Sequence, residues 1–81
     1  MISVYLLVSL NDRQARYIGI TDNVDRRLKE HNSGKGGDYT AKYAAWEVVI
    51  AIRFRDVTRA ERFERYLKSG SGHAFARRHF W

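Results

Sequence analysis

Two β-rich runs separated by a short polar turn constrain the fold of this chain more than any other feature. Ile2 to Ser9 is apolar, with β-branched and aromatic side chains, and Arg16 to Ile20 is a second run of the same character. Only a few residues join them, among them the polar residues 11–14. Because parallel strands need a much longer crossover, the sequence predicts an antiparallel β-hairpin.

A helix and a glycine-rich loop should follow the hairpin. Thr21 or Asp22 can cap a helix that runs to about Asn32. Glycines then break the helix over Ser33–Gly37, and we expect a flexible loop that continues through residues 38–40.

The second half of the chain predicts one more strand and two helices. Glu47 to Phe54 is β-rich, and Thr58 to Glu61 has a capping-box pattern that opens a helix ending near Gly70. A last short helix should cover His73 to His79. The order β-β-α-β-α-α predicts an α/β domain of the α+β type, with a small three-stranded, mainly antiparallel sheet and flanking helices.

Length and composition exclude several classes of protein. With 81 residues, we expect one domain over residues 1–81 and no second recognition module. The absence of cysteine excludes disulfides, thiolate nucleophiles and cysteine-based zinc sites. The apolar start is too short to span a bilayer and lacks the features of a signal peptide. We therefore expect no membrane association and a cytoplasmic location.

Positive charge is concentrated in the last third of the chain. Fifteen Lys and Arg oppose nine Asp and Glu, and eight of the fifteen but only three of the nine lie from Arg53 onward. This asymmetry favours a polyanionic partner such as nucleic acid, although basic residues that serve only solubility are the alternative. Ser33–Gly37 follows a helix and lacks phosphate-loop spacing, so we expect no nucleotide cofactor.

Glu64 lies in an unusual position on the predicted second long helix. It falls beside the apolar stripe that contains Phe63 and Leu67, rather than opposite it. A carboxylate there needs a cation, a hydrogen bond or a metal ion. A salt bridge to Arg65 or Lys68 is the structural alternative to metal binding.

Two further pairs of side chains could carry chemistry. Arg27 and His31 are four residues apart on one helix face, where they could bind one phosphate or where His31 could transfer a proton. Alternatively, their stems pack and their polar ends face water. Tyr5 and Tyr17 lie on neighbouring strands, where tyrosines are most often core residues.

In combination, these segments resemble the GIY-YIG nuclease superfamily. Within it the chain is most similar to small stand-alone proteins related to the N-terminal domain of the UvrC repair nuclease. The resemblance rests on segments in matching order and spacing over essentially the whole chain: Val4–Leu7, Tyr17–Thr21, Asp25–Gly34, Tyr39–Thr40, Ala60–Lys68, and Ser69–Gly72 with Ala74–Phe75.

The resemblance implies a role for each of five residues. Tyr17 matches the tyrosine proposed as general base or as a group that positions the attacking water, and Tyr5 matches a supporting hydroxyl. Arg27 matches the arginine that binds the scissile phosphate. His31 occupies a position that often carries a functional histidine or tyrosine, and Glu64 matches the ligand of one divalent ion, Mg²⁺ or Mn²⁺.

Two positions depart from the family pattern. The first motif reads Ser3-Val4-Tyr5 instead of Gly-Ile-Tyr, a change that many relatives tolerate. Ile20 stands where the UvrC branch carries a lysine thought to help its tyrosine ionise. Because a free tyrosine has a pKa near 10, Tyr17 would need other positive charge, such as Arg27 or the metal, to act as a base.

The sequence thus favours a metal-dependent endonuclease that hydrolyses DNA phosphodiester bonds, by nicking or with selectivity for structure, in repair, recombination or processing. A non-catalytic nucleic-acid-binding module is the main alternative, and an interaction domain with the same fold is a third class. Lys35, Lys68, Arg77 and Arg78 are candidate nucleic-acid contacts. One site per monomer predicts nicking, so a double-strand cut needs two encounters or a homodimer.

Overall fold

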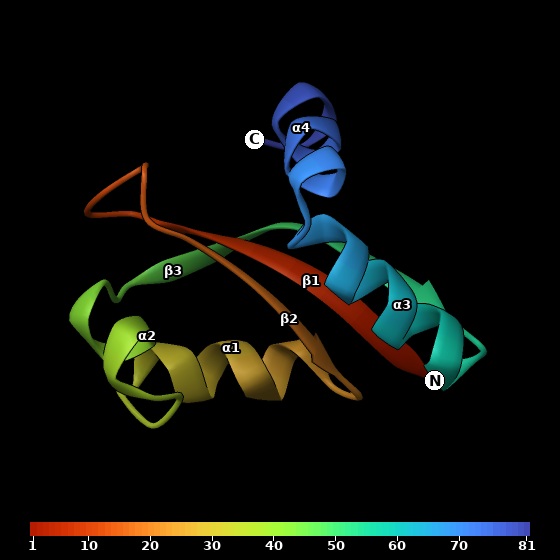
Figure 1. The fold of residues 1–81 in the computed structure, drawn as a ribbon. Helices are drawn as coiled ribbons and strands as arrows, with labels where there is room; N and C mark the ends of the chain where they lie inside the picture. Colours follow the sequence, from red (N-terminus) through yellow and green to blue (C-terminus); the bar gives the residue numbers. More distant parts are fainter.

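The computed structural model describes residues 1–81. It contains three strands and four helices in the order β1 (Ile2–Ser9), β2 (Arg16–Thr21), α1 (Val24–Asn32), α2 (Asp38–Lys42), β3 (Trp46–Phe54), α3 (Val57–Leu67) and α4 (Gly70–His79) (Figure 1). The long elements confirm the predicted order β-β-α-β-α-α.

The sheet is antiparallel throughout, with strand order β2-β1-β3. The predicted hairpin is confirmed: Val4 pairs with Ile20 and Tyr5 pairs with Gly19. The β1–β3 register shifts between Leu6 and Leu7. Because β1 is central, both of its neighbours hold it by hydrogen bonds, while β2 and β3 are edge strands.

The helices cover the sheet from both sides (Figure 1). On one side, Val4 and Leu6 of β1 pack with Ala60, Leu67 and Ala76 of α3 and α4. On the other side, the alternate residues of β1 face the layer that contains α1, where the buried cluster is Tyr5, Leu7, Ala15 and Trp46. Successive side chains of a strand point to opposite faces, so β1 supplies both cores.

Both of the predicted helix caps differ from the observed ones. Helix α1 is capped by Asn23, whose side chain accepts a hydrogen bond from the Arg26 amide at 3.0 Å, and not by Thr21 or Asp22. Helix α3 is capped by Asp56 and not by Thr58. In each case the Asx residue directly before the helix caps the free amides. Thr58 already lies within the first turn of α3, so the predicted capping box does not form.

One helix was not predicted, and another begins before its predicted start. The segment expected to be a loop contains α2, because the Trp46 indole donates to the Thr40 carbonyl at 2.8 Å and holds this turn against β3. Helix α4 begins at Gly70 instead of His73, since the Ser69 hydroxyl accepts from the Gly72 amide at 3.3 Å. Helix α3 accordingly ends at Leu67, before the predicted Gly70.

No helix of this structure is both long enough and apolar enough to cross a membrane.

Candidate active site

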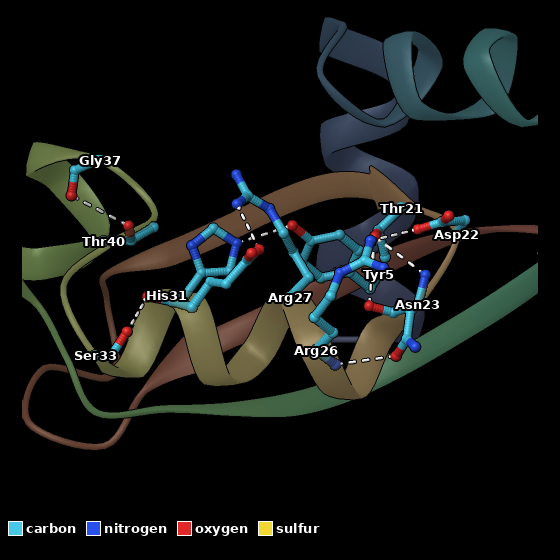
Figure 2. Close-up of polar contacts among 11 residues, drawn as sticks. Tyr5, Thr21, Asp22, Asn23, Arg26, Arg27, His31, Ser33, Gly37 and Thr40 are labelled. Atoms are coloured by element: carbon cyan, nitrogen blue, oxygen red, sulfur yellow. Dashed lines mark hydrogen bonds and ion pairs between the residues drawn. The ribbon is translucent and has the colours of Figure 1, made fainter.

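A cluster of polar and aromatic side chains lies between α1 and the sheet. Tyr5 comes from β1, Tyr17 from β2, and Arg27 and His31 from α1. The Tyr5 hydroxyl lies 2.9 Å from Nε2 of His31, and Arg27 extends beside them (Figure 2). The ring of Tyr17 lies 4.8 Å from that of His31 and 6.0 Å from that of Tyr5, measured between centroids. The structure thus brings together four of the five residues that the sequence singled out.

Strand pairing and helix periodicity explain this convergence. Tyr5 pairs with Gly19 and Leu7 pairs with Tyr17, so the two tyrosines lie on the same face of the sheet. A Cβ at Gly19 would lie 2.5 Å from the Tyr5 hydroxyl, so only glycine leaves room for the tyrosine. Arg27 and His31 are one helical turn apart and therefore point toward the same region.

Burial sets the protonation of Tyr5 and His31. It raises the pKa of Tyr5 to about 12, and the neighbouring Tyr17 adds to this effect while Arg27 opposes it. Burial also lowers the pKa of His31, with a further contribution from the positive charge of Arg27. At neutral pH, Tyr5 is therefore a protonated hydroxyl and His31 a neutral imidazole. Tyr5 can orient other groups but is too weak an acid to serve as the base.

The ring of His31 is enclosed on all sides. The residue is 0% exposed, and its Nδ1 atom has no hydrogen-bond partner. A Cβ at Gly36 would lie 2.2 Å from Nδ1 and 2.9 Å from the Thr40 hydroxyl, so the backbone of the glycine-rich loop closes over this nitrogen. The sequence left open that the stems of Arg27 and His31 pack while their polar ends face water. For His31 this alternative is wrong.

Arg27 remains partly accessible. Its side chain is 31% exposed and pairs with Glu30 at 2.9 Å. The Glu30 carboxylate raises the pKa of Arg27, which is charged in any case. Because this partner lies on the helix surface, the guanidinium can exchange it for a phosphate at little cost.

Glu64 lies on α3, on the other side of the sheet from the cluster. Its side chain is 17% exposed, and its Oε2 atom lies 2.6 Å from the ammonium of Lys68. Of the two salt-bridge partners considered from the sequence, the structure therefore selects Lys68 over Arg65. The metal-binding role stays a prediction.

The donor set at Glu64 fits one kind of metal site. The structure has no group of three or more His, Cys, Asp or Glu side chains that could hold an ion. A lone carboxylate does not suit zinc, which usually takes three or four protein ligands. It does suit Mg²⁺ or Mn²⁺, which keep several waters and take oxygens from a substrate phosphate.

A cavity joins the two halves of the site. It has a volume of about 440 Å³ and is lined by residues of β2, the loops and both helical layers, among them Gln14, Tyr17, Tyr39, Lys68, His73 and Trp81. Tyr17 belongs to the polar cluster, and Lys68 is the ion-pair partner of Glu64. Sequence patterns gave no reason to group Gln14, His73 and Trp81, because only the packing of α4 near the edge of β2 places them together.

The four candidate nucleic-acid contacts do not form one surface with the cavity. Lys68 lines it, whereas Lys35, Arg77 and Arg78 do not. Lys35 is exposed on the glycine-rich loop, and Arg77 and Arg78 are exposed on the last turns of α4. Their contacts with nucleic acid stay predictions.

Comparison with known proteins agrees with this arrangement. The family model described as the GIY-YIG catalytic domain matches residues 1–77. The chain therefore belongs to the GIY-YIG catalytic domain family, which is a family of nucleases.

Two structure-specific endonuclease subunits are similar to part of this chain. SLX1 of Homo sapiens is 42% identical in an alignment of 67 residues, and the match covers 75% of this chain and 24% of that protein. SLX1 of Vanderwaltozyma polyspora is 43% identical in an alignment of 53 residues, and the match covers 59% of this chain and 17% of that protein. The chain thus spans a quarter or less of these relatives.

A solved structure supports the fold. The solution structure of the UPF0213 protein BH0048 from Bacillus halodurans superposes with a TM-score of 0.52 and 34% identity, covering 91% of this chain and 80% of that one. The three-stranded antiparallel sheet with flanking helices is therefore shared with a small protein of similar length.

Proposed function

We propose that this chain is a metal-dependent endonuclease that hydrolyses DNA phosphodiester bonds, nicking one strand per encounter. The observation that carries the proposal is the convergence of Tyr5, Tyr17, Arg27 and His31 beside a cavity that reaches the Lys68–Glu64 pair. The similarity to structure-specific endonuclease subunits supports nucleic acid as the substrate.

Arg27 is the residue suited to the scissile phosphate. Its planar guanidinium is partly exposed and can donate two hydrogen bonds to one phosphate. Charge that accumulates on the phosphate oxygens as the nucleophile attacks is stabilised by such a fixed donor.

Tyr17 is the residue suited to orient or deprotonate the attacking water. It lines the cavity, and so a ligand can reach it, whereas Tyr5 is buried behind it. Tyr5 holds its proton, because its pKa lies near 12, and it donates to groups around it. The neutral His31 ring positions the Tyr5 hydroxyl through their 2.9 Å contact.

Glu64 would hold the divalent ion, which when bound supplies Lewis-acid stabilisation of the leaving 3′ oxygen. The Lys68 ammonium lies 2.6 Å from the Glu64 carboxylate and holds it in place. When the ion binds, Lys68 must move partly away from Glu64. Movement of the Lys68 side chain is therefore part of metal binding.

The Lys68–Glu64 ion pair also supports a second candidate function. A carboxylate already satisfied by a lysine suits a protein that binds nucleic acid through its basic residues without cleaving it. Metal-dependent turnover separates the two functions.

The first experiment incubates the purified protein with supercoiled plasmid and with flap and branched DNAs, in Mg²⁺, in Mn²⁺ and in EDTA. Nicking should require metal and should fall by at least about a hundredfold in Glu64→Ala and in Tyr17→Phe. Glu61→Ala on the same helix and Tyr66→Phe, both outside the cavity lining, are the matched controls and should nick like the wild type.

If the wild type and all four variants nick equally, the activity is a contaminant and the nuclease proposal fails. Salt-sensitive DNA binding in that case would make the binding module the function of the chain.

A further inference from the structure

The cavity beside Tyr17 lies next to the proposed reaction centre and not over it. Tyr17 forms part of its wall, but neither Arg27 nor Glu64 does. From Lys68 it extends past His73 of α4 and past Tyr39 of α2. Because Tyr17 belongs both to the polar cluster and to this wall, a substrate whose scissile phosphate is bound at Arg27 would direct an adjacent nucleotide into this space.

Aromatic side chains give the cavity flat apolar walls. Tyr39 is 46% exposed, yet it is held in place, because its hydroxyl donates to the Arg16 carbonyl at 3.1 Å and its ring packs 5.0 Å from that of Tyr43. In the same lining, the Arg16 guanidinium lies 4.8 Å from the centre of the Trp81 ring. Fixed aromatic and guanidinium surfaces of this kind stack on nucleobases.

Two polar side chains of the cavity are unpaired, and no negatively charged side chain lines it. The side chains of Gln14 and His73 line it and make no hydrogen bond within the protein. Lys68 and Arg16 supply positive charge, and no carboxylate belongs to the lining. The lining therefore offers donors and acceptors to a base edge and positive charge to a phosphate.

The cavity has room for a single nucleobase. About 440 Å³ lies at the small end of the range for pockets that hold one small ligand. Within a duplex both faces of a base are covered by its neighbours, so a base that stacks on the Tyr39 ring must be out of its stack, as in enzymes that act on extruded nucleotides.

We propose that the cavity lined by Tyr39, Gln14, His73 and Lys68 binds the base of a single unpaired nucleotide next to the scissile phosphate. This inference rests on the proposed nuclease function for its biological meaning, because it makes an unpaired nucleotide the structural feature that the enzyme selects. The binding step itself needs no catalysis and can be measured alone.

The test is fluorescence anisotropy with a labelled DNA duplex that contains one unpaired thymidine, in EDTA and at one fixed salt concentration. A second duplex carries an abasic nucleotide at the same position, which keeps the phosphates and removes only the base. The wild-type protein should bind the abasic duplex about tenfold more weakly, since one stacked base contributes this much or more. Equal binding of the two duplexes overturns the proposal, and this comparison needs no variant.

Tyr39→Leu assigns the effect to the cavity. It should bind both duplexes with the affinity that the wild type has for the abasic one, so removing the base and removing the ring should not be additive. Tyr66→Leu is the matched control, because Tyr66 is similarly exposed, at 39%, and lies outside the cavity. If Tyr39→Leu still discriminates tenfold between the duplexes, the base is bound elsewhere and the proposal is wrong.

Failure of this proposal differs from failure of the nuclease proposal. Metal-dependent nicking that is lost in Tyr17→Phe, with equal binding of the two duplexes, leaves an endonuclease without this pocket. Base-dependent binding lost in Tyr39→Leu, without nicking of any substrate, leaves the pocket and removes the nuclease.

Discussion

The two faces of the sheet have opposite chemistry, although the same central strand supplies both. Toward α3 and α4, Val4 and Leu6 pack in an apolar core with Ala60, Leu67 and Ala76, and an aromatic series continues from Phe54 through Phe63 to Tyr66. Toward α1, Tyr5 instead meets an imidazole, and that imidazole keeps a buried nitrogen without a partner.

This difference indicates how so small a domain can maintain a reactive site. A buried polar atom without a hydrogen bond destabilises the fold, typically by about 1–3 kcal/mol. The apolar face must offset that cost through the burial of side chains such as Leu6 and Leu67, which are both 0% exposed. The α3 face therefore supplies most of the stability, and the α1 side holds four of the five groups that we propose for catalysis, the exception being Glu64 of α3.

Neighbouring residues of β1 test this division most strongly. Leu6→Ala should lower the free energy of unfolding by about 2–5 kcal/mol, because it leaves a cavity in the apolar core. That is a large part of the 5–15 kcal/mol typical of a domain. Tyr5→Phe, which only removes a hydroxyl, should cost clearly less while reducing nicking. Urea denaturation of both proteins measures the difference, and equal losses would contradict the division.

Arg27→Ala should reduce nicking strongly and stability little, the reverse of what we expect for Leu6→Ala. Nicking should fall by about 10²–10³-fold if the guanidinium stabilises the transition state. Stability should change by less than about 1 kcal/mol, because the only ion pair lost is the partly exposed one with Glu30. Arg26→Ala, which removes the neighbouring exposed pair with Asp22, is the control and should retain activity. If Arg27→Ala unfolds, the α1 side of the sheet also contributes strongly to stability, and the division is wrong.

Much of this division could be predicted from the sequence. The hairpin followed from two β-rich runs and a short turn, and its register puts Tyr5 and Tyr17 on one face. Helical spacing put Arg27 and His31 together. These are local patterns, in which a few residues determine which side chains point the same way. The resemblance to a known family then assigned roles that no pattern could.

What the sequence did not predict depends on contacts between distant residues or on close competition between neighbours. Asn23 and Asp56 cap their helices because they reach the free amides better than nearby residues do. Helix α2 depends on a hydrogen bond from Trp46. The complete burial of His31 and the grouping of His73 with Tyr17 arise from tertiary packing.

Gly19→Ala should disturb the catalytic face from within the sheet. The added Cβ would lie 2.5 Å from the Tyr5 hydroxyl, so the ring must move away from His31 or the strands must separate. We expect a loss of about 1–3 kcal/mol in stability, as for overpacked cores, with nicking reduced about tenfold. Gly70→Ala is the matched control, because a Cβ there meets nothing within 4 Å. Thermal unfolding and the plasmid assay would compare them, and a fully active Gly19→Ala would show that the Tyr5 position is unimportant.

The smallest expected effect is a dependence of stability on pH that belongs to the α1 face alone. Burial lowers the pKa of His31, with Arg27 acting in the same direction and Glu30 opposing it. The unfolded chain, with an ordinary histidine pKa of about 6.5, therefore binds a proton at a higher pH than the folded protein does. Stability should fall as the pH is lowered through about 6.5, by at most about 1.4 kcal/mol per pH unit for this one group. Urea midpoints at pH 7.5, 6.5 and 5.5 would measure the slope. His31→Gln should reduce it, whereas Leu6→Ala should keep it, since Leu6 packs on the opposite face of the sheet. An unchanged slope in His31→Gln would mean that the buried imidazole is not the group that titrates.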